Sequence, residues 1–81
     1  MLTKILARSF APSIRVNAVA PGLVLQSDLV SAEDWNRLVE RLPLKRAASV
    51  EELASAVDFL LSNEYVTGQT LVIDGGYSLL G

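Results

Sequence analysis

Side chains that carry out acid–base, nucleophilic or metal chemistry are scarce in this 81-residue sequence. It has no histidine and no cysteine, which removes the commonest general base, the commonest metal ligand and all thiolate chemistry. The serines therefore have no histidine to activate them, and neither Tyr65 nor Tyr77 is followed by a lysine four residues later. Glu51 and Glu52 are adjacent carboxylates, but their expected place in the first turn of a helix favours capping over catalysis. We expect the isolated chain to be inactive.

One segment has the order of residues that ligand binding at a sheet edge requires. Residues 17–24 read Asn-Ala-Val-Ala-Pro-Gly-Leu-Val, so a Pro-Gly turn follows a predicted strand. Ligands of open parallel sheets bind beyond the carboxyl ends of the strands. Pro21 would fix the chain at that point, and Gly22 would let the backbone approach a planar ring. An ordinary strand-ending turn explains the same residues equally well.

The helices and strands around this segment can be predicted from the spacing of apolar residues and from the residues that begin or end elements. Apolar residues at helical spacing predict three helices, over residues 1–11, 31–42 and 49–62. The first has no N-cap, so we expect the chain to begin partway through a helix. Ser31 and Ser49 are each followed three residues later by an acidic residue, which predicts a capping box at the start of each later helix.

Two strands complete the expected order of helix, strand, helix, helix, strand. They are predicted over residues 14–20 and 70–73, and the helices between them make a right-handed crossover that leaves the strands parallel. Parallel strands need cover on both faces, and two strands alone seldom make a stable sheet. We therefore expect an α/β arrangement that is incomplete as an isolated domain.

Composition narrows the kinds of partner. The net charge is −2 and the seven Lys and Arg residues are scattered, so nucleic acid binding is not expected. The longest apolar runs fall short of the roughly 18 residues that a membrane span needs, and we expect a cytoplasmic protein. Hydrophobic residues make up 51% of the chain, which is high for its size and indicates apolar surface that further chain or a partner covers. A compact apolar core with ordinary exposed Leu and Ala residues is the alternative explanation.

Four motifs in order resemble the C-terminal portion of the short-chain dehydrogenase/reductase family, and together they cover essentially the whole chain. The first, Leu-Thr-Lys with Leu-Ala at residues 2–7, resembles the end of the family's long helix. Residues 14–22, Ile-Arg-Val-Asn-Ala-Val-Ala-Pro-Gly, resemble the strand and turn beside the nicotinamide. The remaining two resemble the family's next-to-last element with its following helix and the final strand with its closing turn; they are residues 43–61 and 67–76.

The resemblance implies a single partial domain over residues 1–81, the C-terminal part of a doubly wound parallel-sheet Rossmann fold. The catalytic Ser, Tyr and Lys of the family and its Gly-rich turn would lie upstream, so no catalytic residue and no metal ligand is assigned here. In the complete parent protein, which would use NAD(P)(H), Pro21 and Gly22 would shape the cofactor turn. The backbone of Leu23 and Val24 would meet the nicotinamide carboxamide. Gln26 stands where many members have a cofactor-binding Thr, which leaves that contact in doubt.

Residues 25–42 resemble the substrate lid of the family, with Leu25 and Trp35 as its marked apolar residues; core filling explains Trp35 equally well. The start of the loop and its spacing to residues 43–46 resemble pteridine-reductase-like members. Members of the family pair into oligomers, which here implies interfaces through residues 1–11, 49–62 and 70–74.

Two other interpretations remain open. The chain could be a non-enzymatic small α/β module that binds a partner, such as a full-length relative, through its apolar face. It could also be a small dinucleotide-binding protein, but no Gly-rich turn leads into a helix that could hold the pyrophosphate, so we expect the isolated chain to bind no cofactor.

Overall fold

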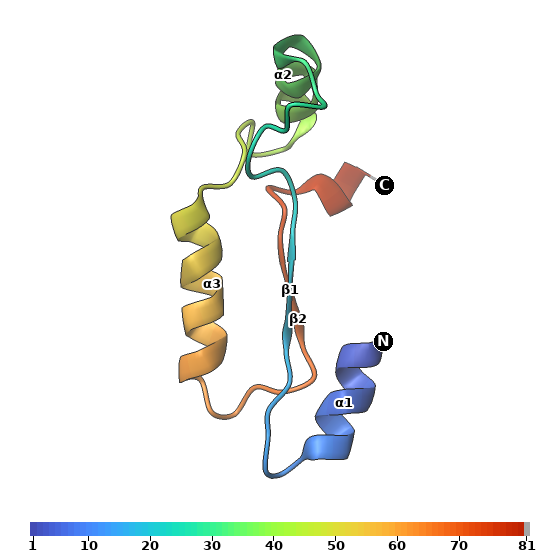
Figure 1. Cartoon of the computed structure of the whole chain (residues 1–81), viewed down its shortest axis with the longest axis vertical. Helices are drawn as coiled ribbons and strands as arrows, with labels where there is room; N and C mark the ends of the chain where they lie inside the picture. The colour runs from blue at the N-terminus through green and yellow to red at the C-terminus, as the bar shows by residue number, and fades with distance from the viewer. Residues whose placement is uncertain (81) are drawn as a thin grey trace.

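The computed structural model describes residues 1–80 and has an elongated shape, with extents of 48 × 25 × 23 Å. Along the chain, the elements are helix α1 (Leu2–Phe10), strand β1 (Ala18–Pro21), helices α2 (Ala32–Arg41) and α3 (Val50–Ser62), strand β2 (Thr70–Ile73) and the 3-10 helix η1 (Tyr77–Leu80). Figure 1 shows α3 on one side of the two strands and α1 on the other, with α2 and η1 beyond the carboxyl ends of the strands.

The two strands are parallel, as predicted, and pair from Ala18 opposite Thr70 to Pro21 opposite Ile73. The predicted end of the first strand at residue 20 is one residue too early. The amides of Ala18 and Gly22 donate to β2, at the carbonyls of Gln69 and Ile73. Because alternate residues of a strand face the same neighbour, the position of Pro21 faces the opposite, free edge, where a missing N–H disrupts no bond to β2.

The predicted start of that strand at residue 14 is also wrong, because side chains make much of the bonding before Ala18, beside one backbone bond from the amide of Gly68 to the carbonyl of Val16 at 2.7 Å. The amide of Val16 donates to the hydroxyl of Thr67 at 3.1 Å. The side chain of Asn17 donates to the carbonyl of Val66 and accepts from the amide of Gln69. This stretch is extended and bonded to its neighbour, but regular pairing begins only at Ala18.

Helix α3 covers one face of the sheet and is fixed at both ends. Its N-terminus has the full predicted capping box, in which the side chains of Ser49 and Glu52 each accept from the other's backbone amide. At its C-terminus, the guanidinium of Arg15 donates to the carbonyls of Leu60 at 2.7 Å and Leu61 at 3.0 Å. Those carbonyls lie in the last turn and have no partner within the helix, so Arg15 caps α3 from the segment before β1.

The other two helices make fewer contacts with the sheet. Helix α1 approaches the start of β2, where Lys4 donates to the carbonyl of Gly68 at 3.2 Å. At the start of α2, Ser31 accepts from the amide of Asp34, but the return bond of the predicted capping box is absent. Aspartate is one methylene shorter than the glutamate that closes such a box. The carboxylate of Asp34 instead lies 3.7 Å from the guanidinium of Arg37.

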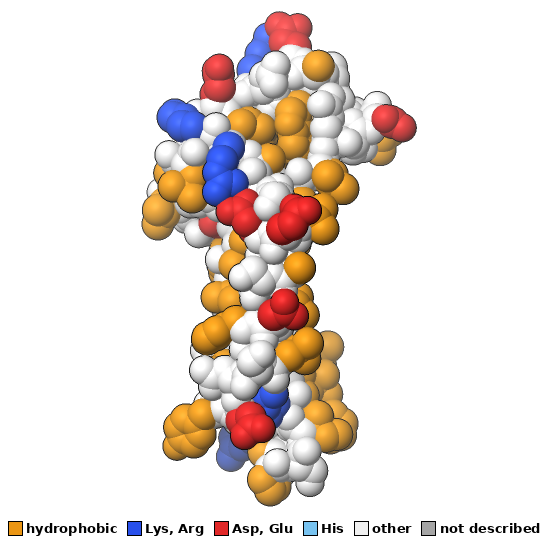
Figure 2. All heavy atoms as spheres, turned by 90° about the vertical axis from the view of Figure 1, so that its left-hand side faces the viewer, with side chains coloured by type: hydrophobic (Ala, Val, Ile, Leu, Met, Phe, Trp, Pro, Cys, Tyr) orange, Lys and Arg blue, Asp and Glu red, His pale blue; other side chains and the backbone are white. Residues whose placement is uncertain are grey.

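The buried core within residues 1–80 is small and consists of Ala7, Leu42, Ala56 and Leu60. Large apolar side chains remain exposed on both helices that flank the sheet, so the expected excess of apolar surface is confirmed. They include Val57 and Leu61 on α3, which are 43% and 69% exposed. Figure 2, which faces the outer side of α3, shows hydrophobic side chains reaching the surface along the height of the molecule. Among residues 1–80, no helix has the length and apolar content that crossing a bilayer requires.

Candidate functional site

The loop that follows β1 is held at two backbone positions. The amide of Gly22 donates to the carbonyl of Ile73 at 2.9 Å, and the carbonyl of Leu23 accepts from the amide of Ala48 at 2.8 Å. A β-carbon at position 22 would lie 2.9 Å from both Cα and Cβ of Asp74. The close approach of the turn after β2 therefore explains why position 22 is occupied by glycine.

The backbone of Val24, the residue after Leu23, makes no hydrogen bond within residues 1–80. Neither its N–H nor its C=O has a partner in that range, and the residue is half-buried. One N–H and one C=O on the same residue offer a donor and an acceptor together, the pattern that a primary carboxamide matches. Because the carbonyl of Leu23 already accepts from Ala48, Val24 is the stronger candidate of the two residues for such a contact.

The rest of the predicted site lies outside this constrained turn. Leu25 is 74% exposed, and Gln26 turns back on its own loop, where its side-chain amide donates to the carbonyl of Val30 at 3.3 Å. Trp35 lies in α2 and is half-buried. This partial burial does not decide between a residue of the lid and a residue that fills the core. The structure thus places Pro21 and Gly22 beside the end of β2 and bonds Leu23 to Ala48, whereas Leu25 and Gln26 make no bond to β2.

The turn after β2 is organised by Asp74, which accepts hydrogen bonds from the amides of Gly76 and Ser78 at 3.0 Å each. Burial acts to raise the pKa of this carboxyl, but these N–H groups outweigh it and hold the pKa below its usual value. The carboxylate is therefore a fixed acceptor inside its own turn, and a role in proton transfer is not indicated.

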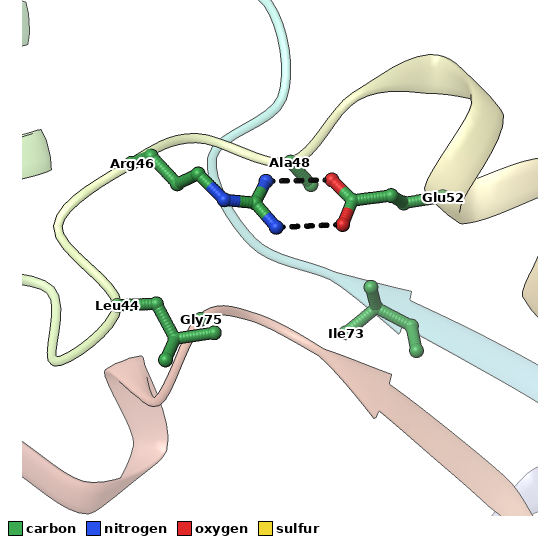
Figure 3. A pocket seen from close by; sticks show the side chains of 6 residues that line it. All are labelled: Leu44, Arg46, Ala48, Glu52, Ile73 and Gly75. Carbon is green, nitrogen blue, oxygen red and sulfur yellow. Dashed lines mark hydrogen bonds and ion pairs between the residues drawn. The ribbon is translucent and has the colours of Figure 1, made fainter.

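A small pocket lies beside this turn and is lined by the shortest ion pair within residues 1–80. Figure 3 shows Arg46 and Glu52 facing each other through two bonds, with Leu44, Ile73 and Gly75 on the other side of the pocket. The two bonds join the guanidinium nitrogens to the carboxylate oxygens at 2.7 and 2.8 Å. The hydrogen bonds from Arg46, followed by that from the Ser49 amide, lower the pKa of Glu52 to about 2.

Sequence reasoning missed the residues that support the loop. Nothing in the sequence marks Ala48 as the partner of Leu23, because the bond is between backbone groups that are far apart in the chain. The motif at residues 67–76 places Asp74 in the closing turn but does not predict its contact with Gly22. Arg15 lies in the motif at residues 14–22, but its bonds to α3 depend on where that helix ends. Within residues 1–80, no three acidic side chains gather in a way that would hold a metal ion.

Known proteins resemble this chain along nearly its whole length. The family model described as enoyl-(acyl carrier protein) reductase matches residues 1–78. Tropinone reductase-like 3 from Erythroxylum coca is 46% identical over 81 residues, which cover 93% of this chain and 31% of that protein. Dihydromonapterin reductase from Citrobacter koseri is 36% identical over 78 residues, which cover 96% of this chain and 32% of that protein.

A solved structure agrees with these matches. FolM alternative dihydrofolate reductase 1 from Brucella suis, crystallised in complex with NADP, has a TM-score of 0.90 and 44% identity over 96% of this chain and 32% of its own. The chain thus spans about a third of the length of the relatives it matches. Because the family model covers nearly every residue and the fold agrees so closely, the chain belongs to the short-chain dehydrogenase/reductase family and corresponds to the C-terminal portion of its Rossmann fold.

Proposed function

We propose that this chain supplies the nicotinamide-side loop, the substrate lid and an oligomer interface of an NADP-dependent oxidoreductase that acts on a carbonyl compound or a pteridine. The observation that carries the proposal is the turn at residues 21–24, held at the carboxyl ends of two parallel strands with the N–H and C=O of Val24 free. Ligands of such sheets bind at this edge. The similarity to a structure in complex with NADP supports the choice of cofactor.

The residues present fit one end of a dinucleotide. Val24 offers a donor and an acceptor to the carboxamide, and Gly22 and Leu23 are kept in place by β2 and Ala48. When bound, the cofactor supplies a hydride; the role of this chain is to orient the ring and, through residues 25–42, to shield it from water. Residues for proton transfer would come from the rest of the reductase, as the family resemblance implies.

We propose further that the exposed apolar faces are covered by the rest of a reductase domain or by a second chain. Phe10 on α1 is 47% exposed, and Phe59 on α3 is 51% exposed. Burying such residues is the main favourable contribution in folding and association. The same observation supports the second candidate function, a non-enzymatic module that binds a partner. Sedimentation of the purified chain separates the two, because a stable discrete complex of copies favours the module and aggregation favours the reductase segment.

A graft tests the enzymatic proposal. Residues 1–81 replace the matching third of the Citrobacter koseri dihydromonapterin reductase, and oxidation of NADPH is followed with dihydromonapterin as substrate. We expect the graft to unfold cooperatively and to retain activity within about tenfold of the parent, which corresponds to about 1.4 kcal/mol in the barrier. A folded graft that binds no NADPH would contradict the proposal. The isolated chain serves as the matched control and is expected to bind none.

A further inference from the structure

The segment over residues 43–48, here called the strap, joins the two loops at the carboxyl ends of the strands. The amide of Ala48 donates to the carbonyl of Leu23 in the loop after β1, at 2.8 Å. The amide of Leu44 donates to the carbonyl of Gly75 in the turn after β2, at 3.1 Å. The strap therefore bonds both loops through its own backbone, and its position determines where the carbonyl of Leu23 lies.

The strap is anchored where it enters from α2. Leu42, the residue before it, is 1% exposed and is the most deeply buried side chain within residues 1–80. Lys45 has a φ of 60°, donates through its amide to the carbonyl of Leu42, and donates through its ammonium group to the carbonyl of Glu40. A β-carbon at Gly76 would lie 2.6 Å from Pro43, so the start of the strap packs directly on the turn after β2.

Its other end is anchored to α3 by the ion pair. Both guanidinium nitrogens of Arg46 bond to the carboxylate of Glu52, in the paired geometry that gives the strongest charge-assisted bonds. Glu52 is itself fixed, because its carboxylate accepts from the amide of Ser49 at 2.9 Å. Arg46 thus connects the strap, just before Ala48, to the first turn of α3 (Figure 3).

We infer that the strap supports the loop at residues 21–24, and that Arg46 and Glu52 are positioning residues for that loop. The side chains of this pair are 58% and 43% exposed, and ion pairs so open to solvent contribute little to the overall free energy of unfolding. Their effect is local: they fix the direction from which Ala48 reaches Leu23. The link to catalysis rests on the proposed function, since this loop is the part of the chain assigned to the nicotinamide.

Amide hydrogen exchange on the grafted reductase, with no NADPH added, tests the inference, so its outcome is independent of whether NADPH binds. The variant Arg46→Met removes the guanidinium and leaves the capping box of α3 intact. We expect exchange of the Ala48 amide to rise at least tenfold, while the Gly22 and Leu53 amides keep their rates. Arg46→Lys, which keeps the charge without the paired bonds, should give an intermediate rate for Ala48.

Arg37→Met is the matched control, because Arg37 forms a similarly exposed ion pair with Glu33 within α2; it should leave the Ala48 amide unchanged. Three results would overturn the inference. The first is an Ala48 amide that already exchanges in the unmodified graft as fast as in an unstructured peptide. The second is an unchanged Ala48 rate in Arg46→Met. The third is an equal rise at Ala48, Gly22 and Leu53, which would show a global effect.

Discussion

Gly22 and Asp74 are in such close contact that a β-carbon on Gly22 would lie 2.9 Å from the Cα and Cβ of Asp74. Each residue follows one of the two parallel strands, so the contact joins the carboxyl ends of β1 and β2 at the backbone. Asp74 has little freedom to move away, because its carboxylate is held by the amides of Gly76 and Ser78. The glycine of the Pro-Gly turn is therefore required by the fold before any ligand is considered.

Replacing this glycine should weaken the junction. We expect Gly22→Ala to lower the free energy of unfolding by about 1–3 kcal/mol, the usual cost of forcing extra atoms into a packed contact. Urea unfolding of the grafted reductase followed by circular dichroism measures the change. Asp28→Ala, at an exposed position of the same loop, is the control and should change stability little. Equal stability of Gly22→Ala and the unmodified graft would show that the turn relaxes freely.

Removing the cap on α3 should detach the end of that helix. Arg15 donates to three main-chain carbonyls, and two of them are in the last turn of α3. We expect Arg15→Met to lower the free energy of unfolding by about 1.5–3 kcal/mol, the range for hydrogen bonds from charged groups. Exchange of the Leu61 and Asn63 amides should accelerate as well. Arg8→Met on α1 is the control, and a loss of the same size there would argue against a specific cap.

A small part of the stability of the grafted reductase should depend on acid through Glu52, because its ion pair with Arg46 is largely exposed to solvent. Its pKa is about 2 in the folded chain against an ordinary value of 4.5, so the folded state favours the ionised form. A lowered pKa stabilises the fold fully above pH 4.5, and this contribution is lost as the pH falls toward 2. In Glu52→Gln, the urea midpoint should therefore fall less steeply over that range than in the unmodified graft. Identical slopes would mean that the ion pair with Arg46 does not persist in solution.

The free amide of Val24 should matter to cofactor binding in the grafted reductase. Val24→Pro removes the N–H, and we expect the dissociation constant for NADPH to rise by about three- to tenfold, as for the loss of one ordinary hydrogen bond. Val24→Ala keeps the N–H and is the control. Titration of the intrinsic fluorescence with NADPH gives both constants. If proline and alanine weaken binding equally, the amide makes no contact with the cofactor.

The features of this structure that the sequence predicts are those that depend on residues close together in the chain. Strand β2 was predicted with its observed ends, because Gly68 and Gly75 bracket a short apolar run. Helix α3 was predicted from Ser49 and Glu52, which are close in sequence and form their bonds within one turn. The family resemblance also came from contiguous motifs, and the family model confirms it.

Contacts between distant residues were not predictable in this way. The start of β1 moved to Ala18 because Asn17 bonds to Val66 and Gln69, which lie about fifty residues further along the chain. The bond from Ala48 to Leu23 likewise joins backbone groups, and backbone groups carry no sequence signal. The loop was therefore identified from its Pro-Gly turn, but the strap that supports it became visible only in three dimensions.

Nuclear magnetic resonance of the graft determines whether the loop after β1 contacts the nicotinamide. With the Leu23 and Val24 amides labelled by 15N, NADPH is added to saturation and contacts between the nicotinamide ring protons and these two amides are measured. We expect a large shift of the Val24 amide and a direct contact to the ring. Saturation with NADPH that leaves the amides of Leu23 and Val24 unshifted would contradict this contact.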